Sequence, residues 1–154
     1  MNLEAREISF ETLSKFLDLK VSEAQSKYVA PNAVTIAQYH YEPSGWVRGL
    51  FDGDAAVGLL AMINPSIPSP SFEEGDPDDG GFMWRLMIGE GFQGKGYGRQ
   101  AVEIAKALCR DWGYTRLYTS AVPGDITPVP FYESCGLRQT GRMLGSEIEL
   151  VADL

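Results

Sequence analysis

Apolar residues recur along this chain in two periods, one typical of helices and one typical of strands. The clearest helical pattern starts at Tyr97, where apolar side chains share one face as far as Trp112, and Gly113 ends it. Shorter helical patterns predict helices over residues 9–19, 22–29, 33–40 and 128–134. Apolar runs predict strands over residues 3–8, 46–51, 55–63, 82–88, 117–122, 137–142 and 147–152.

The order of these elements predicts a single α/β domain over residues 1–154, built on a mixed sheet. Asp52, Gly53 and Asp54 indicate a hairpin turn between two of the strands, and Gly58 hints at a bulge in the second. Residues 64–81 carry four prolines and five acidic side chains, which predicts a long connecting loop.

Composition narrows the class of protein. The chain has 154 residues, 44% of them hydrophobic and 22% charged, which is typical of a globular domain. Thirteen basic against twenty-one acidic residues give a net charge of −8, so nucleic acid is a poor partner. We expect no membrane span, secretory signal or metal site, and a cytoplasmic protein with two free thiols, Cys109 and Cys135.

The charge is unevenly distributed. Residues 85–116 hold six basic and three acidic side chains, whereas the flanking parts of the chain are acidic. A difference of this size can arise by chance. The alternative is that the positive segment binds an anion while the acidic remainder, above all the loop with Glu73, Glu74, Asp76, Asp78 and Asp79, attracts a cation.

The most informative stretch is the glycine-rich segment of residues 91–99, between an apolar strand and an amphipathic helix. A glycine turn at a helix N-terminus leaves backbone N–H groups pointing outward and forms an anion site. A plain turn without a ligand is one alternative. A Rossmann loop requires a different glycine spacing, and a Walker loop requires Ser or Thr after Lys95, where this chain has Gly96.

Two motifs carry a family resemblance over essentially the whole chain. Gln93-x-x-Gly96-x-Gly98 resembles the Arg/Gln-x-x-Gly-x-Gly/Ala signature of the GNAT N-acetyltransferases. Residues 131–137, Phe-Tyr-Glu-Ser-Cys-Gly-Leu, resemble the second signature of that family. Residues 27–38 and 84–88 look similar to its bacterial diamine and spermine/spermidine acetyltransferase branch. The implied fold is a mostly antiparallel sheet of six to seven strands with about four helices.

The resemblance also implies a site for acetyl-CoA and a role for each matching residue. The strand before the signature would pair with the pantetheine arm through Leu86, Met87 and Ile88. The glycine turn would hold the diphosphate; it comprises Gln93, Gly94, Lys95, Gly96, Tyr97, Gly98 and Arg99. Asp125 occupies the position at which members of this family commonly have an asparagine that contacts the cofactor. Tyr132 occupies the position of the family's general acid. The family often forms homodimers.

The acceptor implied by the resemblance is a primary amine, and the acidic charge favours a polyamine or diamine. The amine must lose a proton before it attacks. Many members of the family that the chain resembles use a glutamate on the strand before the signature, but here that strand has Trp84 and Arg85. The remaining candidate bases are His40, Glu42, Glu73 and Glu74. The acceptor could instead be an aminoglycoside, an amino acid or a peptide N-terminus. A non-catalytic acyl-CoA sensor on the same fold is a further alternative.

Overall fold

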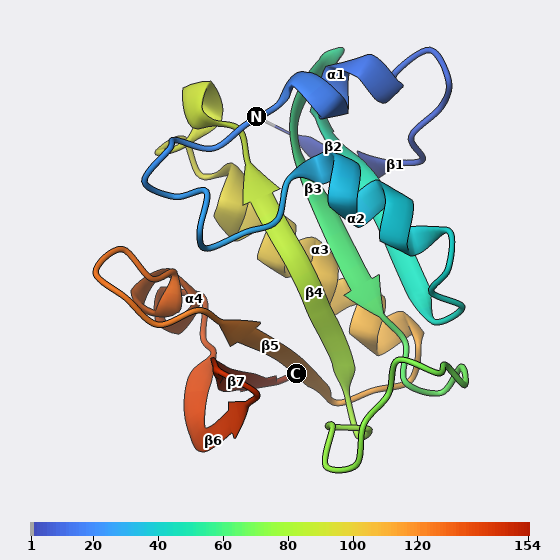
Figure 1. The fold of residues 1–154 in the computed structure, drawn as a ribbon, viewed down its shortest axis with the longest axis vertical. Helices are drawn as coiled ribbons and strands as arrows, with labels where there is room; N and C mark the ends of the chain where they lie inside the picture. Colours follow the sequence, from blue (N-terminus) through green and yellow to red (C-terminus); the bar gives the residue numbers. More distant parts are fainter. Residues whose placement is uncertain (1) are drawn as a thin grey trace.

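Seven strands form one continuous sheet in the computed structural model, which describes residues 2–154 (Figure 1). The strands lie in the spatial order β1-β2-β3-β4-β5-β7-β6. In chain order, the strands are β1 (Leu3–Arg6), β2 (Gly45–Asp52), β3 (Ala55–Ile63), β4 (Gly81–Ile88), β5 (Arg116–Ala121), β6 (Arg138–Leu144) and β7 (Glu147–Asp153). The helices are α1 (Leu13–Asp18), α2 (Asn32–Tyr39), α3 (Tyr97–Asp111) and α4 (Val129–Ser134), with a short 3-10 turn at Glu90–Phe92.

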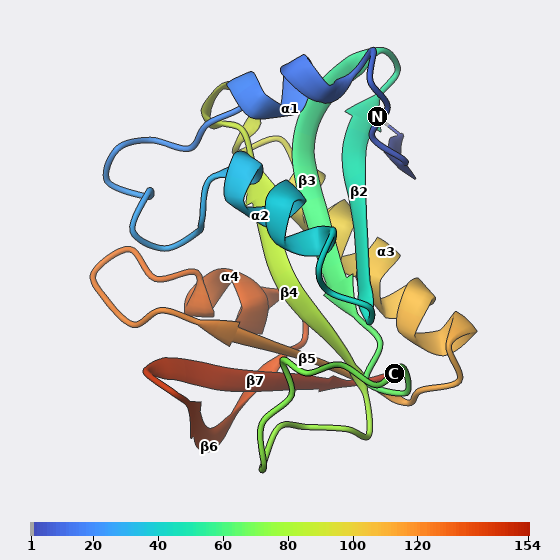
Figure 2. The same cartoon turned by 45° about the vertical axis from the view of Figure 1, so that its right-hand side comes forward.

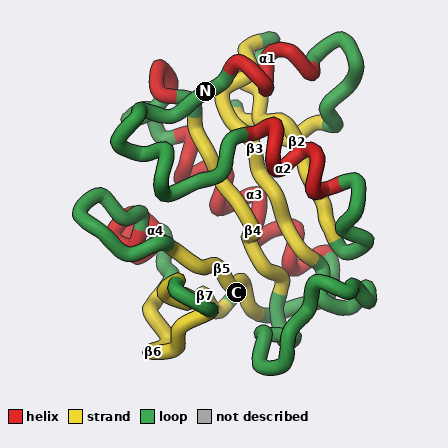
Figure 3. The backbone as a smooth tube through the Cα atoms, in the orientation of Figure 1, coloured by secondary structure: helices red, strands yellow, loops and turns green. Residues whose placement is uncertain are grey.

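All seven predicted strands and the long helix are confirmed, with small shifts at their ends. The predicted helix over residues 22–29 is wrong, because that segment forms successive turns (Figure 3). Ser22 and Gln25 do exchange backbone and side-chain hydrogen bonds of 3.2 Å, as in a capping box. The Gln25 side chain also bonds to Gln93 at 3.0 Å, and Pro31 disfavours helical geometry at the residue before it.

Helices cover both faces of the sheet. In Figures 1 and 2, α1 and α2 lie on one face of the N-terminal strands and α3 on the other. The larger core lies on the α3 side and includes Leu60, Met62 and Ala101, while a smaller cluster on the α2 side includes Val47 and Met87. Within residues 2–154, no helix is long and apolar enough to cross a membrane.

The sheet divides between β4 and β5, and this division creates the site. These two strands are parallel and pair only through Gly81–Met83 against Leu117–Thr119. Beyond Met83, β4 continues alongside β3 whereas β5 continues alongside β7. The two halves of the sheet therefore splay apart, as Figure 2 shows.

Two bulges shape the strands beside this division. The pairing of β2 with β3 shifts where Leu50 faces Gly58, which confirms the expected irregularity at that glycine. A Cβ atom at Gly58 would collide with the Met87 carbonyl oxygen, so a glycine is required for β3 to approach β4. A second shift, opposite Ala61 and Met62, leaves Trp84 as the extra residue on β4 and turns this strand at the start of the splay.

Candidate active site

A cleft of about 790 Å³ opens where β4 and β5 part. Its walls come from six parts of the chain: the turns of residues 21–30, β4, the glycine turn, β5 with the loop after it, α4, and the first residue of β7. Of the residues that the resemblance implies, the following line it: Leu86, Met87, Ile88, Gln93, Gly94, Gly96, Tyr97, Gly98, Arg99 and Tyr132. The fold thus brings together residues from positions 86 to 132.

The glycine turn presents backbone donors to one end of the cleft. Gly94 and Gly96 adopt positive φ angles of 75° and 89°, and a Cβ atom at either would meet nothing within 4 Å. Glycine is required there for its backbone angles, and the outer side of the turn stays open to a ligand. Gly96 caps the fifteen-residue α3, and among the described residues no side-chain cap bonds to the first N–H groups of the helix. This open helix N-terminus is suited to a phosphate or another anion.

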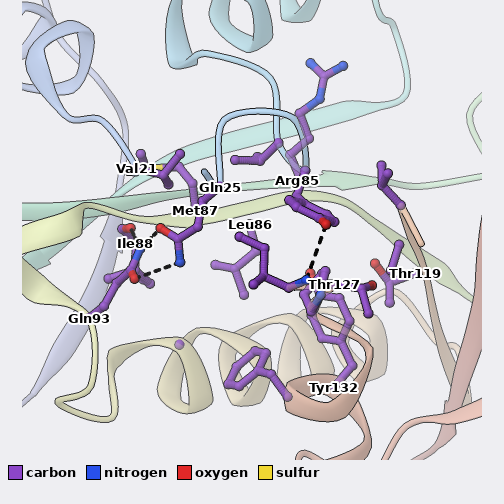
Figure 4. A pocket seen from close by; sticks show the side chains of 18 of the residues that line it. Val21, Gln25, Arg85, Leu86, Met87, Ile88, Gln93, Thr119, Thr127 and Tyr132 are labelled. Carbon is purple, nitrogen blue, oxygen red and sulfur yellow. Dashed lines mark hydrogen bonds between the residues drawn. The ribbon is translucent and has the colours of Figure 1, made fainter. Parts of the chain in front are cut away.

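Gln93 connects this turn to the strand before it. Its side-chain amide donates to the Ile88 carbonyl oxygen at 2.9 Å and exchanges hydrogen bonds of 3.0 and 3.1 Å with the Gln25 amide (Figure 4). One side chain therefore fixes the turn, the end of β4 and the loop of residues 21–30 relative to one another.

The middle of the cleft is an unpaired strand edge. Leu86, Met87 and Ile88 pair with β3 on one side, and no strand of residues 2–154 pairs with them on the side that faces β5. Unpaired backbone donors and acceptors on such an edge can bind an extended ligand that carries amide groups. Tyr28 covers part of the opposite rim, where its hydroxyl oxygen accepts a 3.3 Å hydrogen bond from the Ile126 N–H.

Tyr132 lies on α4 at the base of the splay, beside the point where β4 and β5 separate (Figure 4). Its side chain is 6% exposed. Burial raises the pKa of Tyr132 to about 12; a hydrogen bond with Thr119 acts in the opposite direction, and the charge of Glu147 adds to the increase. The hydroxyl therefore stays protonated at physiological pH and can serve as a hydrogen-bond donor or as a general acid, but it does not start the reaction as a phenolate base.

Contacts between α3 and α4 fix the position of Tyr132. A Cβ atom at Gly98 would lie 3.0 Å from Phe131 Cζ, so the glycine allows α4 to pack closely on the start of α3. The Arg99 guanidinium donates to the Ser134 carbonyl oxygen at 2.9 Å and to Ser134 Oγ at 3.1 Å. Arg99 therefore holds the end of α4 while its side chain borders the cleft.

Two residues implied by the resemblance lie outside the cleft lining, namely Lys95 and Asp125. Both are exposed, and the Lys95 ammonium lies 5.9 Å from the centre of the Phe92 ring. Thr127, two residues after Asp125, does line the cleft, and its hydroxyl is buried without a hydrogen-bond partner among residues 2–154. The sequence offered only a weak signal for Thr127: a hydroxyl residue just before the proline that starts α4.

Tyr97 has two separate roles at this end of the cleft. Its ring borders the glycine turn, but its hydroxyl donates to Asp52 Oδ2 of β2 at 2.5 Å. This hydrogen bond, burial and the carboxylate charge together raise the pKa of Tyr97. The hydroxyl is therefore engaged in fixing α3 to the sheet.

The side chains considered as bases lie elsewhere. His40 is exposed after α2, and Glu73 and Glu74 border a small depression beside β6, outside the cleft. Burial alone would raise the pKa of Glu42, but hydrogen bonds from Ser69, Ser71 and Ser44 outweigh it and lower that pKa. Glu42 therefore anchors the long loop and is a weaker base than an ordinary glutamate.

A residue that sequence reasoning missed is Glu147, the first residue of β7, which lines the cleft together with Arg85. No local motif marks it. Only the pairing of β7 with β5 brings it to the site, through a register that places Ile148 opposite Ala121.

An open helix N-terminus, an unpaired strand edge and a buried tyrosine in one cleft define a site for transfer from an extended anionic cofactor. The chain belongs to the acetyltransferase (GNAT) family, whose model matches residues 5–137. The fold prediction made from the two motifs is thereby confirmed.

Individual relatives are distant. The chain is 24% identical over 149 residues to a spermine/spermidine N(1)-acetyltransferase of Bacillus subtilis (strain 168), a match that covers 93% of this chain and 92% of the relative. A solved acetyltransferase from Thermus thermophilus has a TM-score of 0.76 at 20% identity, covering 100% of this chain and 98% of that one. The aminoglycoside acetyltransferase AAC(6')-Ib, solved with ribostamycin and coenzyme A, has a TM-score of 0.77 at 15% identity, covering 99% and 94%.

Proposed function

We propose that this acetyltransferase moves an acetyl group from acetyl-CoA to a primary amine of a polyamine or diamine, by direct attack within a ternary complex. The observation that carries the proposal is the geometry of the cleft. It joins the open N-terminus of α3, the free edge of β4 and the buried hydroxyl of Tyr132.

The residues present fit coenzyme A. Its diphosphate would lie against the backbone N–H groups from Gly94 to Gly98, where the helix dipole adds favourable charge. The amides of the pantetheine arm would pair with the free edge of Leu86–Ile88. The buried Thr127 hydroxyl has no partner among residues 2–154 and would gain one from the bound arm. When bound, acetyl-CoA supplies an activated acyl group.

Tyr132 supplies the proton, or the hydrogen bond, that the departing sulfur needs. A thiol near its reference pKa of about 8.5 is far more acidic than a phenol near 12, and full transfer to it would cost roughly 5 kcal/mol. Burial of the sulfur narrows this difference in pKa, because it disfavours the charged thiolate. In this protein burial raises the pKa of the Cys109 thiol to about 11. Against a thiol desolvated to that degree, proton transfer from Tyr132 costs on the order of 1 kcal/mol.

Polyamines are supported as acceptors by two observations. The Bacillus subtilis relative is named a spermine/spermidine acetyltransferase, and the net charge of −8 attracts a polycation over a range of about a Debye length, roughly 8–10 Å. The acidic loop would contribute at long range only, since its carboxylates lie outside the cleft.

One observation favours a second candidate, an amino acid. In residues 2–154 the cleft lining holds one carboxylate, Glu147, beside the cations Lys27, Arg85 and Arg99. Arg85 and Glu147 together could match the carboxylate and the ammonium group of a zwitterionic acceptor. For a polyamine, Glu147 is the one carboxylate among the described lining residues that could bind an ammonium group.

The test is acetyl-CoA turnover, followed as thiol release, with spermidine, spermine, putrescine, an aminoglycoside, several amino acids and a short peptide, each at low and high salt. We expect preference for a polyamine, with a KM that rises with salt. Preference for an amino acid would select the second candidate. Coenzyme A binding with no turnover of any amine would refute catalysis and indicate a sensor.

A further inference from the structure

Glu147 is the one acidic side chain among the described residues that line the cleft. It is half-buried at the start of β7, next to the tight turn from β6, where it pairs with Leu144. The Ser120 hydroxyl donates to Glu147 Oε1 at 3.1 Å. Within residues 2–154 it forms no ion pair, so the second carboxylate oxygen retains its capacity to accept hydrogen bonds.

Arg85 contributes the opposite charge from the other wall of the cleft. Its guanidinium donates to Thr35 Oγ1 at 3.1 Å and Gln38 Oε1 at 2.6 Å, and its Cζ lies 4.8 Å from the centre of the Trp84 ring. These contacts fix the positive charge on the side of α2. The cleft is therefore positive beside α2 and negative beside β7.

The charge of Glu147 reaches the reacting end of the cleft. Desolvation lowers the pKa of Arg85, and the Glu147 carboxylate acts against that change. The same carboxylate contributes, after burial, to the raised pKa of Tyr132. Glu147 is thus near enough to affect the pKa values of Arg85 and Tyr132, but it forms no ion pair with the arginine and lysine side chains that line the cleft.

We propose that Glu147 binds the ammonium group of the acceptor and takes its proton before attack. This inference rests on the proposed function. It gives a residue of β7 the role that the family resemblance implies for a glutamate on β4, where this chain has Arg85. Because Arg85 repels cations, it orients the acceptor so that any further ammonium groups lie away from α2.

The proton and electron balance is complete with the groups already named. One N–H bond of the ammonium breaks and its proton passes to Glu147. The freed nitrogen lone pair forms the C–N bond to the acyl carbon, the C–S bond breaks, and the sulfur leaves with that electron pair and takes the proton of Tyr132. The acylated nitrogen loses its surplus proton to the Tyr132 oxygen, and Glu147 releases its own proton to solvent.

The test compares Glu147→Gln with Asp153→Asn. Both remove one negative charge from β7, but Asp153 is exposed and pairs with Arg116 and Arg138, outside the cleft. For Glu147→Gln we expect the acceptor KM to rise at least tenfold, kcat to fall at least tenfold, and the KM for acetyl-CoA to stay within twofold. Asp153→Asn should leave all three within twofold. A purely structural role for Glu147 would change both substrates' KM values together.

Calorimetry supplies a readout that needs no turnover. Spermidine, or the best amine of the panel, is titrated into each protein saturated with coenzyme A. A Kd at least tenfold weaker in Glu147→Gln than in the native protein supports the inference, and Kd values within twofold overturn it. Amine binding that depends on Glu147, without turnover, would uphold the binding role of Glu147 and refute both its role as a base and the proposed function. If no amine binds the native protein, both are refuted.

Discussion

Tyr132→Phe is the most direct test of the chemistry proposed for the cleft. The substitution removes one oxygen atom and leaves a ring of the same shape in a site that is 6% exposed. With a pKa of about 12, fewer than about one hydroxyl in a thousand is ionised at pH 8, so the variant loses a hydrogen-bond donor and not a charge.

The expected loss follows from the chemistry of the sulfur. A hydrogen bond to a group that develops negative charge contributes about 1.5–3 kcal/mol, and general acid catalysis contributes roughly 10²–10⁴-fold. We expect kcat to fall by roughly 10²–10³-fold, equivalent to about 3–4 kcal/mol. Coenzyme A affinity should stay within twofold, since the diphosphate site is on α3. The free energy of unfolding should change by about 1 kcal/mol or less.

Steady-state turnover, calorimetry with coenzyme A and thermal unfolding measure these three quantities. Tyr118→Phe is the matched control. Tyr118 is 7% exposed, and its hydroxyl donates to Asp79 Oδ1 at 2.7 Å, away from the cleft lining. Its loss should leave kcat within twofold. A kcat for Tyr132→Phe within threefold of the native value, with the protein folded, would remove Tyr132 from the mechanism.

Two further predictions follow from buried groups. Thr127→Val should leave the free energy of unfolding unchanged or raise it by up to about 1 kcal/mol, because the substitution removes a buried hydroxyl without a partner among residues 2–154. The same variant should bind coenzyme A about threefold to tenfold more weakly by calorimetry. Unchanged affinity would show that Thr127 does not contact the cofactor. Ellman's reagent at pH 8 should label neither Cys109 nor Cys135 in the native protein and both in guanidinium, since both are buried and the pKa of Cys109 is raised to about 11; fast labelling of the native protein would contradict this.

Local sequence patterns identified most of the elements and the glycine turn at one end of the cleft. The apolar face that starts at Tyr97 predicts α3, because a helix buries residues spaced three and four apart whatever surrounds it. The glycines at 94 and 96 predict an open turn, because only glycine adopts their backbone angles without cost. Residues 22–29 show the limit of this reasoning, since they form turns in which Gln25 bonds to Gln93, a residue distant in the sequence.

Local sequence patterns also did not predict which side chains of irregular segments point into the cleft. Asp125 and Thr127 lie in one short loop, and the path of that loop decides that Thr127 borders the cleft while Asp125 faces solvent. Spacing from Tyr132 alone pointed to Asp125. A loop has no fixed period, so counting residues does not predict which side chain points inward.

The sequence by itself determined the family and the glycine turn, and it predicts the role of Tyr132, because each depends on residues close together in the chain. Tertiary structure alone decided which charged side chains line the cleft. Glu147 reaches the cleft because β7 pairs antiparallel with β5, and Arg85 turns toward α2 because Thr35 and Gln38 accept its hydrogen bonds. Both placements are set by pairing and packing between segments that lie about 30 to 50 residues apart, and no local pattern encodes such contacts.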